Sequence, residues 1–179
     1  MSAQTYTFRQ PQSSDAPALS HLYGSVWAHF FAYSVSPSDL EDYLSGPLSP
    51  SSIERDIADP TARFLLATTQ TPDGKDTIIG AVQLATGMSE PCLAESSTIH
   101  LRRLYIDMAH HGSGLAGDLM ARTEEMARKE GYRSLWLGVW EDNKRGRRFY
   151  EKMGFVERGQ KYFMVGESRR RDLVLEKTI

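Results

Sequence analysis

The fold is decided by residues 98–117, TIHLRRLYIDMAHHGSGLAG. The first half of this stretch, as far as Asp107, is typical of a long strand. Apolar side chains then recur at helical spacing from Leu115 until Gly131, a C-terminal cap, and residues 134–139 predict another strand. Because a strand, a helix and a strand follow one another, we expect the two strands to be parallel neighbours joined by a right-handed crossover.

A glycine-rich loop, HGSGLAG at residues 111–117, joins the first strand to the helix. Glycines let the chain turn tightly and leave backbone N–H groups uncovered. The start of the helix adds a partial positive charge. The loop is therefore suited to a phosphate or pyrophosphate, although a tight strand-to-helix turn without any ligand explains the same glycines.

The same glycines also fit a dinucleotide-binding pattern, G-x-G-x-x-G, at Gly112, Gly114 and Gly117. Glu141 follows the next strand, where such a site places a ribose-binding acid. This alternative is disfavoured because the chain predicts only one strand-helix-strand unit, with hairpins on either side. A Walker-type phosphate loop is disfavoured because no Lys-Ser or Lys-Thr pair follows the glycines.

The rest of the chain predicts antiparallel strands and helices around this unit. We expect strands at 6–10, 63–69, 77–85, 162–165 and 172–177, helices at 15–31 and 143–153, and hairpin turns at 72–74 and 166–168. Capping boxes that begin at Ser38 and Ser51 predict two further short helices. The order predicts a mixed α/β sheet that is antiparallel at its ends and parallel in the middle.

Composition narrows the class of protein. The 179 residues, 40% of them hydrophobic, predict a single domain over residues 1–179 with a core of its own. The single Cys92 cannot form an internal disulfide, the N-terminal region lacks the features of a signal peptide, and no apolar run is long enough to span a membrane. We therefore predict a cytoplasmic protein with neither a membrane nor a nucleic acid as its partner.

Charge is divided unevenly along the chain. Residues 1–100 carry 11 acidic and 4 basic groups, a net −7, and residues 101–179 carry 12 and 17, a net +5. This division fits an anionic cofactor on the second half and a cationic substrate near the first, although a chance distribution gives the same numbers. The acids that could contact such a substrate are Asp39, Glu41, Asp42, Glu90 and Glu95.

A second informative stretch is LWLGVWEDNKRGRRFYEKMGF, residues 135–155. It has Asn143 at the end of a strand, a small residue three positions later, and then Phe-Tyr-x-x-x-Gly-Phe. This stretch resembles the second signature block of the GNAT superfamily of N-acetyltransferases. Together with the glycine loop, it makes the resemblance specific. The run over residues 136–177 looks particularly like the PaiA branch of polyamine N-acetyltransferases, and the resemblance covers most of the chain.

The resemblance implies a GNAT fold: an α/β protein with a central mixed, mostly antiparallel sheet of about seven strands, a splayed parallel pair in its middle, and flanking helices. It also implies acetyl-CoA as the cofactor. Basic residues of the helix at 143–153 could meet its 3′-phosphate, the alternative being a basic face that is only solvated. The residues that would bind acetyl-CoA are Leu104, Tyr105, Ile106, His111, Gly112, Ser113, Gly114, Leu115, Ala116, Asn143, Tyr150 and Lys152.

Two residues are candidates for the proton transfers of acetyl transfer. Tyr150 shares a helix face with Asn143 and is our candidate general acid, the alternative being an aromatic that only packs. His100 is the candidate base, with Glu95 or a chain of water molecules as alternatives. By strand alternation His100 shares a face with Leu104, whereas Leu101 and Tyr105 take the other face, so a buried structural imidazole is also possible.

Several residues depart from the superfamily's pattern. His111 stands where Gln or Arg is usual, and Gly146 stands where Ala is usual. The PaiA branch often carries acids where this chain has His100 and Arg102, which puts polyamine specificity in doubt. Phe149 and Met153 are expected to be core side chains only.

We predict an N-acetyltransferase that acts on a small, cationic, polyamine-like primary amine. The alternatives are an acyl-CoA-binding regulatory protein without turnover and a dinucleotide-dependent oxidoreductase. A homodimer through an exposed strand edge is expected from the resemblance. No metal site is predicted, because His110 and His111 are adjacent and no carboxylate or Cys is placed to complete one.

Overall fold

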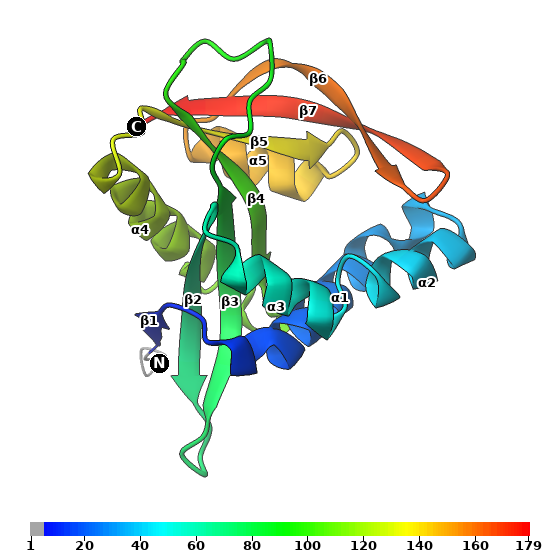
Figure 1. Ribbon diagram of the computed structural model, residues 1–179, viewed down its shortest axis with the longest axis vertical. Coiled ribbons are helices and arrows are strands. Elements are labelled where there is room, and N and C mark those ends of the chain that lie inside the picture. Colours follow the sequence, from blue (N-terminus) through cyan, green and yellow to red (C-terminus); the bar gives the residue numbers. More distant parts are fainter. Residues whose placement is uncertain (1–5) are drawn as a thin grey trace.

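Seven strands form one open sheet at the centre of the molecule, in the order β1-β2-β3-β4-β5-β7-β6 (Figure 1). The structure is a computed structural model that describes residues 6–179. The strands are β1 (Thr7–Arg9), β2 (Ala62–Gln70), β3 (Asp76–Ala85), β4 (Thr98–Ile106), β5 (Ser134–Trp140), β6 (Val156–Val165) and β7 (Ser168–Thr178). Only β4 and β5 are parallel, which confirms the predicted mixed α/β sheet.

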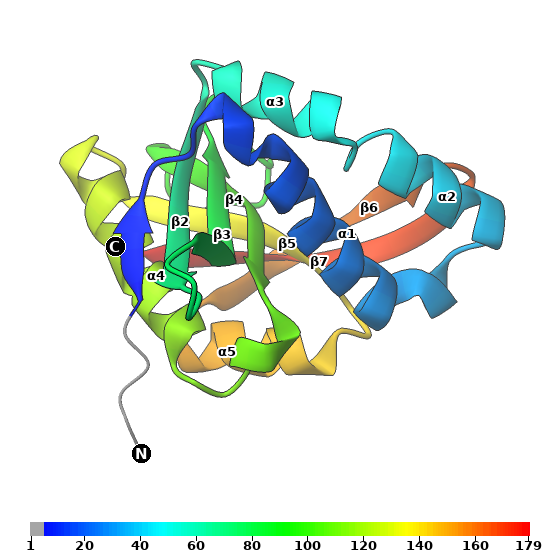
Figure 2. The ribbon, with the colours of Figure 1, turned by 90° about the horizontal axis from the view of Figure 1, so that it is seen from below.

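Helices cover both faces of this sheet. In the described residues they are α1 (Ala16–Phe31), α2 (Pro37–Ser45), α3 (Pro50–Ala58), α4 (Leu115–Lys129) and α5 (Lys144–Lys152). Figures 1 and 2 show α1, α2 and α3 on one face and α4 and α5 on the other. Each face has its own apolar core, one built around Leu119 and Leu135 and the other around Tyr23 and Trp27.

The parallel strands β4 and β5 are paired only where they begin. Thr98 lies opposite Ser134, and the last pair is His100 with Trp136. Beyond this point β4 continues beside β3 to Ile106, and β5 continues beside β7. The two strands therefore splay apart, as predicted. The β5-facing edge of β4 beyond His100 has backbone groups without a strand partner.

A β-bulge interrupts β4 at Arg102. In the register with β3, Arg103 opposes Gln83 and Leu101 opposes Leu84, so Arg102 is one residue too many for a regular ladder. As a result Leu101 packs in the core beneath α4, whereas Tyr105 packs in the core beneath α1. The predicted alternation, which put both on one face, was wrong because the extra residue reverses the direction of every later side chain.

The two short helices begin two residues earlier than predicted. The N-cap side chains are Ser36, which accepts a 3.1 Å hydrogen bond from the Asp39 N–H, and Ser49. Ser38 and Ser51 are therefore not the caps. The reason is that Pro37 and Pro50 occupy the first helical position, where the missing N–H and the fixed φ of proline favour helix initiation.

The C-terminal hairpin is much longer than the predicted strands at 162–165 and 172–177. Residues 156–161 of β6 form an edge strand with mostly exposed, polar side chains, so no apolar alternation marks them as strand. The turn is fixed by Asp39 of α2, whose carboxylate accepts hydrogen bonds from the Glu167 N–H at 3.2 Å and the Ser168 N–H at 3.1 Å. Asp39 is thus engaged within the protein and is not free to bind a substrate.

The topology excludes the dinucleotide alternative. A dinucleotide-binding fold needs repeated parallel crossovers, whereas β4 and β5 form the sole parallel pair among the strands of residues 6–179. Glu141, the candidate ribose ligand, instead forms an ion pair with Arg171. The remaining predicted helices and strands agree with the observed ones to within one or two residues.

Candidate active site

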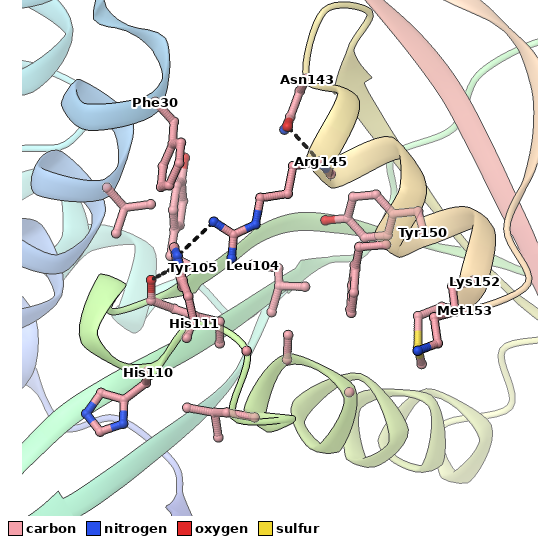
Figure 3. Close-up of a pocket in the computed structure, with 18 of the residues that line it drawn as sticks. Phe30, Leu104, Tyr105, His110, His111, Asn143, Arg145, Tyr150, Lys152 and Met153 are labelled. Atoms are coloured by element: carbon pink, nitrogen blue, oxygen red, sulfur yellow. Dashed lines mark hydrogen bonds between the residues drawn. The ribbon is translucent and has the colours of Figure 1, made fainter.

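A first cavity of about 470 Å³ lies between the end of β4, the glycine loop and α5, with α1 closing one side (Figure 3). Its walls are largely apolar, with the loop backbone at one end and Lys152 at another. The lining residues include Phe30, Leu104, Tyr105, Ile106, His111, Gly112, Gly114, Leu115, Ala116, Asn143, Arg145, Tyr150 and Lys152.

The glycine loop has the properties of an anion site. Gly112 and Gly114 have φ angles of 81° and 92°, a conformation that favours glycine. Apart from the glycine itself, its chain neighbours and the adjacent backbone of its own helix, no atom lies within 4 Å of the position that a Cβ would take at Gly112, Gly114 or Gly117. In the described part of the chain the N–H groups of Gly112, Gly114 and Ala116 have no acceptor. Uncovered N–H groups at the start of α4 fit a pyrophosphate.

His111 joins the loop to the rest of the site. Arg145 of α5 donates a 2.9 Å hydrogen bond to its Nδ1, so the proton lies on Nε2, which donates to the Ile106 carbonyl at 2.9 Å. Burial and the neighbouring guanidinium both lower the pKa of the imidazole. The neutral ring therefore ties the end of β4, the glycine loop and α5 together in the wall of the cavity.

Helix α5 supplies two polar groups at the gap between β4 and β5. The Asn143 side chain caps the helix by accepting a 2.9 Å hydrogen bond from the Gly146 N–H. The Tyr150 hydroxyl has no hydrogen-bond partner among residues 6–179 and points into the cavity (Figure 3). Burial raises the pKa of Tyr150 well above its ordinary value, so the hydroxyl stays protonated at neutral pH.

A second cavity, of about 640 Å³, opens on the side of α1, α2 and the β6–β7 hairpin. Aromatic side chains form much of its wall: Trp27, Phe31, Tyr43, Trp140 and Phe163. The residues that line both cavities are Phe31, Leu104, Tyr105, Asn143 and Tyr150. The two cavities therefore meet at the splay of β4 and β5, with the Tyr150 side chain between them.

Three of the six acidic and basic side chains that line the second cavity are paired with a carboxylate. Arg103 bonds Asp56 at 2.5 Å and Gln83 at 2.6 Å, and Arg102 bonds the same Asp56. Lys161 pairs with Glu90 at 3.1 Å. The other three are the exposed Asp42 and the buried Arg170 and Asp172, and neither of the buried two forms an ion pair in the described residues.

His100, the candidate base, lies in the wall of the second cavity. Its ring stacks on Trp136 with centroids 4.0 Å apart, and its Nδ1 is buried without a hydrogen-bond partner. Burial, with Lys161 and Arg102 adding to it, lowers the pKa of His100 to about 3. An imidazole with this pKa is a poor acceptor for a proton from an ammonium group of pKa about 10.

Most of the predicted cofactor residues lie together. All except Ser113 line the first cavity, and the Ser113 hydroxyl instead donates to the His110 carbonyl at 2.7 Å within the turn. Phe149 and Met153, expected to be core only, also line the cavity. Phe30 was not foreseen, because no sequence motif reveals which turn of the first helix reaches the loop.

The acids proposed for a cationic substrate are mostly elsewhere. Besides Asp39 in the hairpin turn, Glu90 is paired with Lys161. Of the five, Asp42 alone lines the second cavity, and it is exposed. The sequence could not reveal this, because charge along the chain does not say which cavity a side chain faces.

Metal-ligand clusters and membrane-spanning helices are both absent from residues 6–179. No group of three or more His, Cys, Asp or Glu side chains is placed to hold a metal ion. In the same part of the chain, no helix has both the length and the apolar character needed to cross a membrane.

Known proteins resemble this chain in sequence and in fold. Residues 26–155 match the acetyltransferase (GNAT) family. The chain belongs to this family. The GNAT protein is 30% identical over 141 residues to an uncharacterized N-acetyltransferase of Mycobacterium tuberculosis, which covers 79% of this chain and 83% of the relative. It is 25% identical over 170 residues to an uncharacterized N-acetyltransferase of Lactobacillus delbrueckii subsp. lactis, which covers 95% of each.

Solved structures agree on the fold of this GNAT protein. The crystal structure of PaiA N-acetyltransferase from Thermoplasma acidophilum in complex with coenzyme A superposes with a TM-score of 0.73 at 21% identity, covering 98% of this chain and 99% of the other. The acetyltransferase yncA from Salmonella typhimurium, with acetyl-CoA, superposes with a TM-score of 0.63 at 18% identity, covering 97% and 94%. The chain is thus an N-acetyltransferase with acetyl-CoA as its co-substrate.

Proposed function

We propose that the enzyme transfers the acetyl group of acetyl-CoA, held in the first cavity, to a primary amine held in the second. The observation that carries this proposal is that the two cavities meet at the splay of β4 and β5. A thioester from one side and an amine from the other can approach each other there directly, which favours attack in a ternary complex.

The glycine loop, the open edge of β4 and the basic face of α5 would bind the cofactor. The N–H groups of Gly112, Gly114 and Ala116 are available for the pyrophosphate. The backbone edge of Leu104 to Ile106 has no strand partner on the β5 side, and its Ile106 carbonyl is taken by His111. The remaining groups of this edge would pair with amides of the pantetheine arm, and one N–H there would polarise the thioester carbonyl. Lys152 is available for a phosphate oxygen.

Tyr150 is proposed as the general acid. Acetyl-CoA supplies an activated acetyl group as a thioester. In the transfer, the amine nitrogen bonds to the carbonyl carbon, the carbon–sulfur bond breaks, and the leaving sulfur takes a proton from the Tyr150 hydroxyl. The proton lost by the amine passes to solvent, because the pKa of about 3 argues against the base role predicted for His100.

Replacement of Tyr150 by Phe tests the acid role. We expect kcat to fall about 100-fold, in the range typical for a lost general acid, with the KM for acetyl-CoA changed only a few-fold. Thiol release with acetyl-CoA and the best amine of a panel would be measured. Tyr132→Phe is the matched control, since Tyr132 packs at the α4 core and lines neither cavity. Full kcat in Tyr150→Phe would remove Tyr150 from this role.

The identity of the amine is a finer proposal. The resemblance to the PaiA branch suggests a polyamine, and spermidine therefore belongs in the panel. Calorimetry with acetyl-CoA and turnover of a panel of polyamines, amino acids, amino sugars and peptides test the proposed transfer. Tight acetyl-CoA binding without turnover of any of these amines would contradict it. A homodimer and a cytoplasmic location remain proposals from the sequence.

A further inference from the structure

Arg170 of β7 is a buried cation without a polar partner. Its side chain lines the second cavity and the residue is only 6% exposed. In residues 6–179 its guanidinium makes no hydrogen bond and no ion pair, and its Nε is completely buried. The guanidinium carbon instead lies 4.4 Å from the ring centre of Trp140 and 5.2 Å from that of Phe31.

Such an arrangement is unfavourable in the absence of a ligand. Aromatic faces attract a cation, but they do not replace the hydrogen bond that the buried Nε–H loses, and the guanidinium as a whole is largely removed from water. Burial accordingly lowers the pKa of Arg170. Arg103 differs, because its guanidinium donates hydrogen bonds to both Asp56 and Gln83. The N–H groups of Arg170 are therefore available to a ligand. A planar guanidinium fits a carboxylate, which it can bind through two hydrogen bonds.

Asp172 presents the complementary charge two residues along the same strand. Side chains at i and i+2 point to the same face of a strand, and both residues line the second cavity. Asp172 is 9% exposed and its buried Oδ1 has no hydrogen-bond partner in the described chain. Burial raises its pKa, although Arg170 and Lys161 act in the opposite direction. The two opposite charges are near each other but form no ion pair.

We propose that the acceptor is an amino acid, whose carboxylate binds Arg170 and whose ammonium group lies toward Asp172 before it is acetylated. This inference rests on the proposed function and names the class of its substrate. A zwitterion supplies one partner to each unpaired group. The aromatic wall of Trp27, Phe31 and Tyr43 leaves room for an apolar side chain.

A polyamine fits the same cavity poorly. Every additional ammonium group would come near the cations of the wall, which are Arg102, Arg103, Lys161 and Arg170. Asp42 is the other acid of the wall, and it lies exposed at the rim. For an amino acid as acceptor, the same bonds form and break as in the acetyl transfer proposed above. The products are an N-acetyl amino acid and free CoA.

The substrate test compares acids with their uncharged analogues. The acids of the panel are the proteinogenic L-amino acids, 4-aminobutyrate and 5-aminopentanoate. Each is compared with its amide and its decarboxylated amine where these exist, and spermidine is added as a polyamine. We expect the best substrate to carry a carboxylate, with kcat/KM for its amide about 100-fold lower. An amide, a decarboxylated amine or spermidine that is turned over as well as the best acid would overturn the proposal.

Variants then test the two residues. Arg170→Gln is expected to lower kcat/KM for the amino acid about 100-fold and to leave that for the amide within a few-fold, while Arg170→Lys retains part of the preference. Asp172→Asn is expected to raise the KM for the acceptor and not that for acetyl-CoA. Arg169→Gln is the matched control, because Arg169 is adjacent, exposed and stacked on Tyr162. An unchanged acid-to-amide ratio in Arg170→Gln would refute the role of Arg170.

Two further measurements separate misfolding and loss of function from failure of this inference. Acetyl-CoA affinity should be the same in Arg170→Gln and in the wild type, and the melting temperature of the variant should be no lower, because a buried cation without a partner is removed. If Arg170→Gln does not fold, the acid-to-amide ratio of Arg170→Lys decides the question in its place. If wild-type protein binds acetyl-CoA but acetylates nothing, the proposed function fails. If it acetylates amines without preference for a carboxylate, the function stands and the amino-acid assignment fails.

Discussion

Single side chains in the second cavity differ in how their burial is compensated. Lys161 and Arg103 have carboxylate partners, whereas His100 has a stacked ring and a buried Nδ1 without a partner. Because the charged imidazole is disfavoured there, the pKa of His100 falls to about 3. His100 is thus a site at which acid should weaken the fold.

The direction of this pH dependence follows from the pKa of His100 in the folded and in the unfolded chain. The unfolded pKa is about 6.5, so between pH 6.5 and 3 the unfolded chain binds a proton that the folded chain does not, and stability falls as pH falls. At pH 5 the free energy of unfolding is lower than at neutral pH by about 2 kcal/mol, since one pKa unit corresponds to about 1.4 kcal/mol.

Replacing His100 by Phe should remove this acid sensitivity while keeping a ring on Trp136. Urea unfolding of wild type and His100→Phe at pH 7.5 and pH 5, without cofactor, would measure it. We expect the variant to gain about 1 to 2 kcal/mol relative to wild type between the two pH values. An identical pH dependence of the two proteins would mean that His100 titrates normally in the fold.

At the scale of one element, the start of α5 explains a departure from the superfamily. A Cβ at Gly146 would lie 2.5 Å from Asn143 Nδ2 and 2.9 Å from its Cγ. The cap side chain therefore occupies the space that an alanine methyl group needs. Glycine at this position weakens the helix but preserves the Asn143 cap.

A double-mutant cycle tests this coupling. Gly146→Ala alone should change the free energy of unfolding by less than about 0.5 kcal/mol, because the gain in helix propensity of about 1 kcal/mol is offset by loss of a cap worth about as much. In the Asn143→Ala background the same substitution should stabilise by about 1 kcal/mol. Thermal or urea unfolding measures both. Equal effects in the two backgrounds would show that cap and methyl group do not compete.

At the scale of the whole molecule, the fold holds two cavities on opposite sides of one gap in its sheet. If the first binds acetyl-CoA in the folded state only, saturation at about 100 times Kd stabilises by about 2.7 kcal/mol. For a chain of this size that raises Tm by about 5 to 10 °C. Differential scanning fluorimetry should show this shift with acetyl-CoA and not with NAD at equal concentration. A larger shift with NAD would contradict the cofactor assignment.

The edges of the sheet bear on assembly. β1 and β6 are the two end strands, and β6 is the longer, with Val156, Tyr162 and Met164 exposed. The homodimer predicted from the sequence stays a prediction, and β6 is the edge that such a dimer would use.

The sequence by itself determined the parallel strand pair, the glycine loop and the two helices that follow the central strands, whereas the splay of the pair was implied by the family resemblance. These are local: glycine at positive φ, a capping Asn143 and apolar periodicity each act within a few residues of themselves. Nearly all of the cofactor residues that the resemblance implied do line the first cavity, because they belong to those two contiguous stretches.

Tertiary structure alone decided the second cavity. Three of its features arise from contacts between distant parts of the chain: the bulge at Arg102, the hydrogen bonds of Asp39 in the β6–β7 turn, and the burial of Arg170 and Asp172 without ion pairs. Asp39 and Glu167, for example, lie more than a hundred residues apart in the sequence. No local pattern distinguishes Arg170 from its neighbours Arg169 and Arg171, since strand register and packing determine which of the three faces the core. The acceptor pocket follows from contacts that form only when the chain is folded.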